Sequence, residues 1–169
     1  AMSEKVRIGI VGIGNMGSNH SKNILAHKVE HLELAAVCDI APEKLAWAEK
    51  NLPGVPRFSD YKEMIASGLL DAVLIATPHY LHPEIAKAAF AAGLHVLTEK
   101  PAGVYTKQVE EMNEAAQKSG KVFCIMYNQR TNPQFQKIRE LVQIGRLGQL
   151  KRCIWIITNW YRTQAYQTT

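Results

Sequence analysis

Three glycines near the start of the chain have the spacing of a phosphate-binding turn. Gly12, Gly14 and Gly17 follow an apolar stretch and precede a helix-like one. In this pattern the first glycine allows a tight turn, the second lets the backbone approach phosphate, and the third lets the helix pack on the strand. The following helix would offer free N–H groups to an anion. We therefore expect a dinucleotide pyrophosphate to bind at this loop, which also contains Asn15 and Met16.

An acidic residue, Asp39, follows the next apolar run, Leu32–Val37. It lies 27 residues after Gly12, whereas about 20 residues is the usual spacing, and the polar connection 27–31 absorbs the extra length. A carboxylate here can accept hydrogen bonds from adenosine ribose hydroxyls and would repel a 2′-phosphate, which favours NAD over NADP. The alternative is that Asp39 only caps the turn before Pro42, the start of the next helix.

The first 130 residues alternate short apolar runs with segments of helical periodicity. Strands are expected over 6–11, 32–37, 57–58, 71–76, 95–98 and 122–126, and helices over 18–27, 42–51, 61–67, 81–92 and 104–119. Regular alternation predicts an α/β fold, a doubly wound parallel sheet of Rossmann type. Ligands of such sheets bind beyond the carboxyl ends of the strands.

The expected strand 71–76 is followed by four residues of interest. Thr77 can hydrogen-bond phosphate or ribose, and Pro78 sets the turn into the next helix. His79 and His82 are candidates for contact with cofactor or substrate. The alternative for each histidine is a partly exposed residue at the start of a helix.

Two further strand ends carry polar side chains. Lys100 can hold a substrate hydroxyl and shift its proton as an alcohol is oxidised, and Glu99 can contact the nicotinamide ribose. An exposed Glu–Lys ion pair is the alternative for these two. The segment Tyr127–Arg130 adds Asn128, whose amide suits a carboxamide or hydroxyl.

Composition argues against several other classes of protein. The hydrophobic content of 47% is ordinary for a globular core, and no apolar stretch reaches the ~18 residues of a membrane span. The N-terminal residues lack the pattern of a signal peptide. Cys38, Cys124 and Cys153 have no metal-like spacing, which argues against a metal site and favours free thiols in a reducing cytoplasm. Cys38 and Cys124 lie in apolar runs, so we expect both to be buried.

The chain carries a net charge of +5, which raises the question of nucleic-acid binding. Its late basic residues alternate with apolar ones at helical spacing, and no DNA- or RNA-reading motif is present. A solvated helix face explains them, so no nucleic-acid partner is expected.

The end of the chain has a different pattern. Pro133–Ile144 is typical of a helix, residues 145–148 of a turn, and Leu150–Trp160 of a strand. An apolar strand needs a sheet partner, without which it is a sticky edge. We therefore expect a dinucleotide-binding domain over 2–130, and over 131–169 a linking helix with only the first strand of a second, truncated α+β domain.

Four blocks together resemble the Gfo/Idh/MocA family, the group of glucose–fructose oxidoreductase and inositol dehydrogenase. They occur in the family's order, cover nearly the whole chain, and are residues 9–17, 76–82, 92–101 and 127–130. The resemblance implies a nicotinamide-dependent oxidoreductase that acts on a sugar, polyol or related substrate. It also implies that Lys100 takes part in substrate binding and proton transfer. His79 departs from the family, in which many members have asparagine.

The family's second domain supplies most of the substrate pocket, together with an Asp and a His that complete catalysis. No residue here matches those two. A noncatalytic nucleotide-binding or oligomerising module, using the strand Leu150–Trp160, is therefore the alternative to a dehydrogenase, and a homo-oligomer through that strand is expected.

Overall fold

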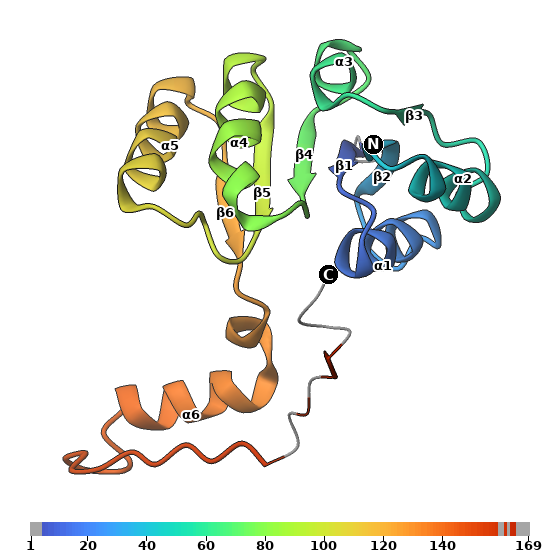
Figure 1. The fold of residues 1–169 in the computed structure, drawn as a ribbon. Coiled ribbons are helices and arrows are strands. Elements are labelled where there is room, and N and C mark those ends of the chain that lie inside the picture. The colour runs from blue at the N-terminus through green and yellow to red at the C-terminus, as the bar shows by residue number, and fades with distance from the viewer. Residues whose placement is uncertain (1–4, 159–160, 162, 165–169) are drawn as a thin grey trace. The chain divides into compact units, whose positions relative to one another are not determined.

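The computed structural model describes residues 5–158, 161, 163 and 164. The chain divides into two compact units, residues 1–127 and 128–169. The first unit contains the sheet and its helices, and the second contains one longer helix and the segment that follows it (Figure 1).

The first unit is built on a six-stranded sheet with strand order β3-β2-β1-β4-β5-β6. Each neighbouring pair of strands is parallel. The strands are β1 (Val6–Val11), β2 (Leu32–Cys38), β3 (Arg57–Phe58), β4 (Ala72–Ile75), β5 (His95–Glu99) and β6 (Phe123–Met126). The expected doubly wound parallel sheet is confirmed.

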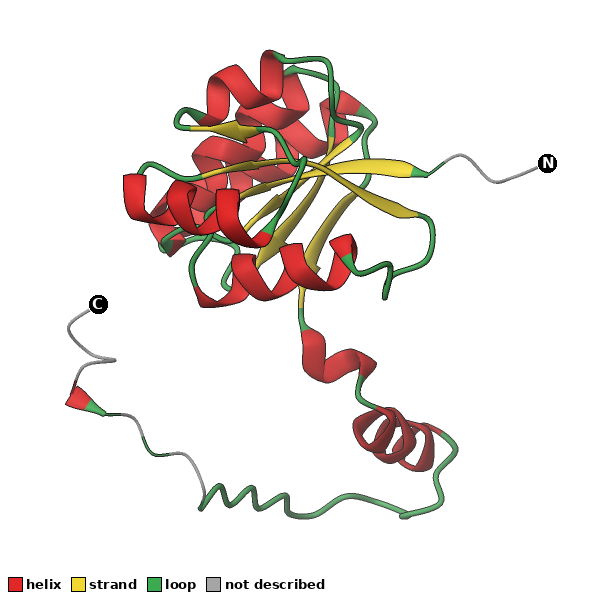
Figure 2. Ribbon diagram, turned by 90° about the vertical axis from the view of Figure 1, so that its right-hand side faces the viewer, coloured by secondary structure: helices red, strands yellow, loops and turns green. Residues whose placement is uncertain are grey.

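Helices cover both faces of this sheet (Figure 2). They are α1 (Asn15–Leu25), α2 (Pro42–Asn51), α3 (Tyr61–Ala66), α4 (His82–Ala91) and α5 (Thr106–Ser119), with a short 3-10 turn, η1, at His79–Leu81. One apolar cluster lies under α1 and α2, and a second lies under α3, α4 and α5. All four residues of β4 are buried. They are all apolar, as expected of a strand that is covered by helices on both faces of the sheet.

Local signals in the sequence determine where several helices begin and end. Asp60 caps α3 by accepting a hydrogen bond from the backbone N–H of Lys62 at 2.8 Å. Gly93 and Gly120 end α4 and α5 in the left-handed region, with φ of 76° and 64°. The one larger difference is α1, which begins at Asn15 rather than Ser18, because Gly14 is already its N-cap.

The strand order reverses between β1 and β4. From β1 the chain continues to β2 and β3 on one side, and from β4 it continues to β5 and β6 on the other side. Such a switch point leaves a crevice beyond the carboxyl ends of the two strands, where ligands of this architecture bind. In Figure 1 the arrowheads of β4 and β6 point to this edge.

Two glycines allow α1 to approach the turn after β1 closely. Gly12 has φ of +93°, and a Cβ on it would lie 2.6 Å from the carbonyl oxygen of Ala76. A Cβ on Gly17 would overlap the carbonyl oxygen of Gly12. Only glycine therefore fits at either position without moving the helix or the strand.

The cysteine expectations are met at one position and wrong at another. Cys38 is buried, and burial, followed by the nearby carboxylates of Asp39, Asp60 and Glu63, raises its pKa to about 12. Cys124, which we expected to be buried, is exposed. It lies on β6, the last strand of the sheet, where neighbouring side chains are present on one side only.

The second unit begins with a 3-10 turn, η2 (Asn128–Thr131), followed by α6 (Pro133–Gln143). The Asn132 side chain caps α6 by accepting from the N–H of Gln134 at 2.9 Å. The expected strand Leu150–Trp160 is not formed over its described part, residues 150–158. A strand requires a partner for its backbone groups, and these residues have none within the described chain. Residues 159 and 160 lie outside the described residues, and pairing of this segment with a second copy stays a prediction.

Two kinds of feature are absent from the described residues. No helix there has the length and apolar character needed to cross a bilayer. No group of three or more His, Cys, Asp or Glu side chains in that part of the chain could hold a metal ion.

The glycine packing gives a direct test of the fold. We expect Gly17→Ala to lower the free energy of unfolding by roughly 2 kcal/mol or more, because its Cβ overlaps backbone rather than a movable side chain. Gly14→Ser is the control: a Cβ there meets nothing within 4 Å, and serine is a good N-cap. Urea unfolding followed by circular dichroism measures both, and equal stability of the two variants would contradict this packing.

Candidate functional site

The glycine loop is held in place by hydrogen bonds from both neighbouring strands. The N–H of Gly12 donates to the carbonyl of Cys38 at 2.8 Å, and the N–H of Ala76 donates to the carbonyl of Val11 at 2.8 Å. The loop is thus tied to the ends of β2 and β4. This places it at the switch point identified from the strand order.

The N-terminus of α1 is open. Gly14 is the N-cap, and among the described residues no side chain bonds to the first N–H groups of this helix, in contrast to α3 and α6. Asn15 and Met16 are exposed beside it. Uncapped N–H groups carry a partial positive charge that favours an anion. Gly14 leaves these groups accessible, because no atom lies within 4 Å of where its Cβ would be.

Asp39 accepts two backbone hydrogen bonds, one of which is the turn cap considered as the alternative from the sequence. Its Oδ1 accepts from the N–H of Ala41 at 2.9 Å, which is the expected turn cap. Its Oδ2 accepts from the N–H of Ile13 at 2.7 Å, within the glycine loop. The half-buried carboxylate therefore lies directly against the loop, and each oxygen keeps a lone pair for a further donor.

The segment after β4 lies against the same loop. The carbonyl of Ala76 and the backbone nitrogen of Thr77 lie so close to Gly12 that a Cβ on Gly12 would clash with them. Thr77 is half-buried, and its hydroxyl lies 3.5 Å from the carbonyl of Pro78, a long and weak contact. Pro78 and His79 are exposed at the start of η1. Thr77 and Pro78 thus border the switch point, and their contact with a cofactor stays a prediction.

His82 has an internal role, which corrects the expectation that it contacts a cofactor. It is fully buried, with a relative exposure of 0%. Its Nε2 lies 2.9 Å from the carbonyl oxygen of Thr77, and its Nδ1 lies 2.7 Å from that of Pro101. A neutral ring donates to one of these oxygens at a time. His82 therefore connects the loop after β4 with the loop after β5, and its side chain has no surface left for a ligand.

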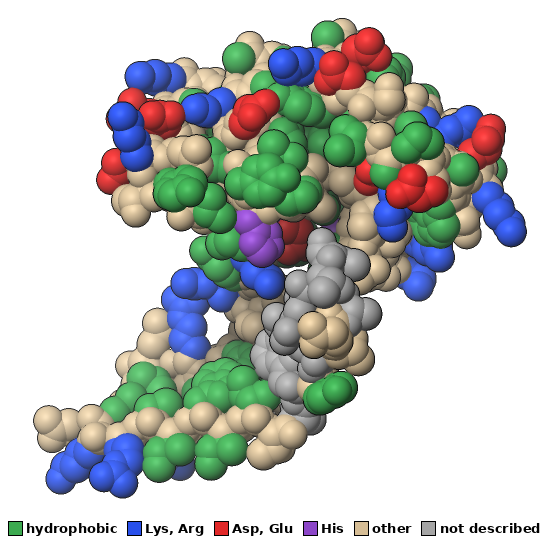
Figure 3. Space-filling model, in the orientation of Figure 1, with side chains coloured by type: hydrophobic (Ala, Val, Ile, Leu, Met, Phe, Trp, Pro, Cys, Tyr) green, Lys and Arg blue, Asp and Glu red, His purple; other side chains and the backbone are tan. Residues whose placement is uncertain are grey.

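The end of β5 carries the acidic and basic candidates, and they are not an ion pair. Glu99 is buried, and its Oε1 lies 2.9 Å from Nε2 of His20 on α1. Lys100 is exposed, and no hydrogen bond or ion pair involves its ammonium among the described residues. Figure 3 shows histidine and acidic side chains together at this edge of the first unit. The exposed-ion-pair alternative for Glu99 and Lys100 is wrong.

His20 was missed by the sequence reasoning. It lies one helical turn after Gly17, on the same side of α1 as the residue that packs on the strand. That spacing was a signal available in the sequence. Its partner was not, because Glu99 is 79 residues away and only the strand order brings the two together.

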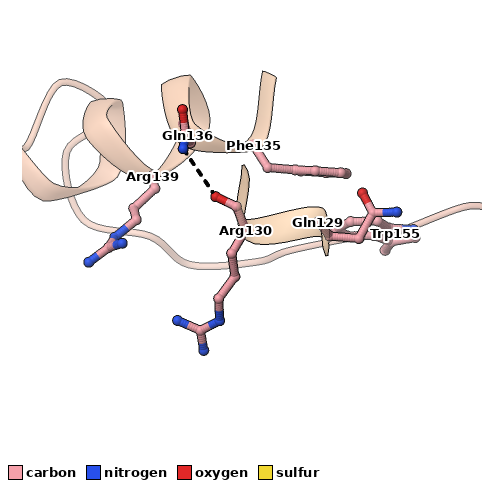
Figure 4. Close-up of a pocket in the computed structure, with 6 residues that line it drawn as sticks. All are labelled: Gln129, Arg130, Phe135, Gln136, Arg139 and Trp155. Carbon is pink, nitrogen blue, oxygen red and sulfur yellow. Dashed lines mark hydrogen bonds between the residues drawn. The ribbon is translucent and has the colours of Figure 1, made fainter. Parts of the chain in front are cut away.

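Asn128 belongs to the second unit, where its carbonyl accepts from the Thr131 hydroxyl at 2.8 Å within η2. The same unit has a hollow of about 260 Å³. Figure 4 shows its lining, in which the Gln136 amide donates to the carbonyl of Arg130 at 3.3 Å. Phe135 and Trp155 stack there with ring centroids 5.3 Å apart. No residue of the glycine loop lines this hollow.

Comparison with known proteins identifies the family of the chain. Residues 6–127 match the model of the Gfo/Idh/MocA oxidoreductase family, described by its NAD-binding Rossmann fold. The chain belongs to this family. The match spans all six strands of the sheet, from β1 to β6, and so includes the glycine loop, Asp39 and the Glu99–Lys100 segment.

Individual members of the Gfo/Idh/MocA family are similar to this chain at about the same level. Inositol 2-dehydrogenase of Corynebacterium glutamicum is 32% identical over 150 residues, which are 88% of this chain and 44% of that relative. The crystal structure of scyllo-inositol dehydrogenase from Lactobacillus casei, with bound NAD(H) and scyllo-inositol, matches with a TM-score of 0.81 at 31% identity. The match covers 86% of this chain and 43% of the dehydrogenase chain. The WlbA dehydrogenase from Bordetella pertussis, in complex with NADH and UDP-GlcNAcA, has a TM-score of 0.81 at 34% identity, with coverage of 88% and 42%. The chain thus spans less than half the length of these relatives.

The bridging role of His82 can be tested by replacing its ring with one that cannot donate. We expect His82→Phe to lower the free energy of unfolding by about 3 kcal/mol, because one buried carbonyl group loses its donor and the ring no longer links the two loops. His79→Phe is the matched control: this exposed histidine should tolerate the change within about 0.5 kcal/mol. Chemical denaturation measures both, and similar losses for the two variants would argue against the bridge.

Proposed function

We propose that this chain binds NAD across the carboxyl edge of its sheet, and that it serves a dehydrogenase that acts on a hydroxyl of a polyol or sugar. The observation that carries the proposal is the open N-terminus of α1 beside Asp39. There a helix N-terminus without a side-chain cap lies next to a carboxylate, within a chain of the Gfo/Idh/MocA family.

Residues at the carboxyl edge of the sheet suit successive parts of the dinucleotide. Uncapped N–H groups after Gly14 suit the pyrophosphate, since it is an anion and can approach a backbone that has no Cβ. Asp39 suits the hydroxyls of the adenosine ribose, which donate to a carboxylate. Thr77 and Pro78 border the crevice on the β4 side, and Glu99 closes it at the end of β5.

We assign NAD rather than NADP to this site on electrostatic grounds. Both oxygens of Asp39 already accept backbone hydrogen bonds, which hold the carboxylate in its place beside the loop. A 2′-phosphate would bring like charge against it. The next two residues are Ile40 and Ala41, and neither can neutralise that charge.

Lys100 is the candidate catalytic residue. Its exposed ammonium follows the buried Glu99 directly and has no ion-pair partner among the described residues, so Nζ is available to a substrate hydroxyl. The ammonium can donate a hydrogen bond to the hydroxyl oxygen. Once it has lost a proton to solvent, the neutral amine can accept the hydroxyl proton as the carbon is oxidised. A bound nicotinamide would supply the hydride acceptor.

The substrate class rests on the relatives. Inositol 2-dehydrogenase of Corynebacterium glutamicum is named for its action on inositol, and the compounds bound in the two solved complexes are a cyclic polyol and a sugar nucleotide. These compounds share secondary hydroxyl groups on a six-membered ring. We infer a substrate of that kind for the protein to which this chain belongs.

Fluorescence titration of the nicotinamide tests the cofactor assignment. We expect the chain to bind NADH with a dissociation constant below about 1 mM and to bind NADPH at least roughly tenfold more weakly, since like charges repel at Asp39. Gly14→Ser should weaken NADH binding by roughly tenfold, because its side chain fills the approach to the phosphates, while the unfolding free energy stays unchanged.

Three results of the titration would count against the assignment. Absence of NADH binding at millimolar concentration would overturn the cofactor site. A preference for NADPH would remove the role given to Asp39. Unchanged NADH affinity in Gly14→Ser would separate the glycine loop from the pyrophosphate.

A further inference from the structure

The Glu99 carboxylate is fixed on one side and open on the other. The residue is buried to a relative exposure of 7%, and its Oε1 bonds to His20. The one side-chain N or O that is both sealed from solvent and unpartnered among the described residues is Oε1 of Gln108. The second oxygen of Glu99, Oε2, does not belong to that class, so solvent reaches it, and no donor among the described residues bonds to it.

The fixed side of Glu99 is held by the same helix that faces the pyrophosphate. His20 lies on α1, and its side chain is only 20% exposed. Through a contact of 2.9 Å it joins that helix to the end of β5, 79 residues away in sequence. A displacement of α1 would thus move the carboxylate, and the reverse also holds.

The bond also resolves an electrostatic conflict at this edge. A buried carboxylate without a donor is costly, and its negative charge would oppose a diphosphate bound nearby. The His20 ring supplies the donor through Nε2. Among the described residues no other donor bonds the Glu99 side chain.

We propose that His20 is a positioning residue of the cofactor site, which orients Glu99 so that Oε2 accepts a hydrogen bond from a hydroxyl of the nicotinamide ribose. The inference rests on the proposed NAD site and extends it by a residue on a different element. His20 acts through Glu99 and touches no part of the ligand. Its removal should therefore affect the nicotinamide half of the dinucleotide and leave the adenosine diphosphate half unaffected.

The test compares two ligands that differ in that half. We expect His20→Leu to weaken NADH binding by roughly tenfold, the loss of one charge-assisted hydrogen bond, and to leave ADP binding within about twofold of the wild type. His20→Gln, whose Nε2 can donate to the same oxygen, should restore NADH affinity to within about threefold. Asn19→Leu is the matched control, since it places the same leucine on an exposed position of α1. Calorimetric titration of the full chain measures both ligands.

A double-mutant cycle shows whether His20 acts through Glu99. In a Glu99→Gln background, His20→Leu should have little further effect on NADH affinity. Equal weakening of NADH and ADP, or additive effects of the two substitutions, would overturn the inference while leaving the NAD site in place. Absence of NADH binding by the wild type would overturn the proposed function, and this inference with it.

Discussion

The close approach of α1 to the turn after β1 is the constraint on which the site depends. Gly17 lies against the carbonyl of Gly12, and Gly12 in turn lies against the backbone after β4. Three elements therefore meet through closely packed backbone atoms. This contact directs the open N-terminus of α1 toward the switch point of the sheet. It requires glycine at positions 12 and 17, whereas a Cβ on Gly14 would meet no atom within 4 Å.

Around this contact, side chains from distant positions join the strand-end loops to one another. Asp39 holds the glycine loop from the end of β2, His82 links the loops after β4 and β5, and His20 links α1 to Glu99. Each bond uses a group that is half-buried or buried. The crevice is thus preorganised: its polar groups are held by the protein, and binding a ligand requires little ordering of these residues.

The sequence was sufficient for the sheet and for the glycine turn after its first strand, and insufficient where a partner was distant. Periodicity and glycine spacing predicted the strands and the loop because both are local properties of the chain. The role of His82 was predicted wrongly, since only the fold shows that two carbonyl groups enclose its ring. His20 escaped notice for the same reason. The segment 150–158 was predicted as a strand from its apolar residues, but a strand also needs a partner, which composition does not reveal.

The central claim is that a dinucleotide lies across the carboxyl edge of the sheet, and amide NMR of the isotope-labelled chain tests it most directly. On addition of NADH we expect the largest shift changes at the backbone amides of Ile13, Gly14 and Asn15, with further changes near Asp39 and Glu99. Changes confined to other parts of the chain, such as the hollow that contains Trp155, with the glycine loop unaffected, would contradict the account.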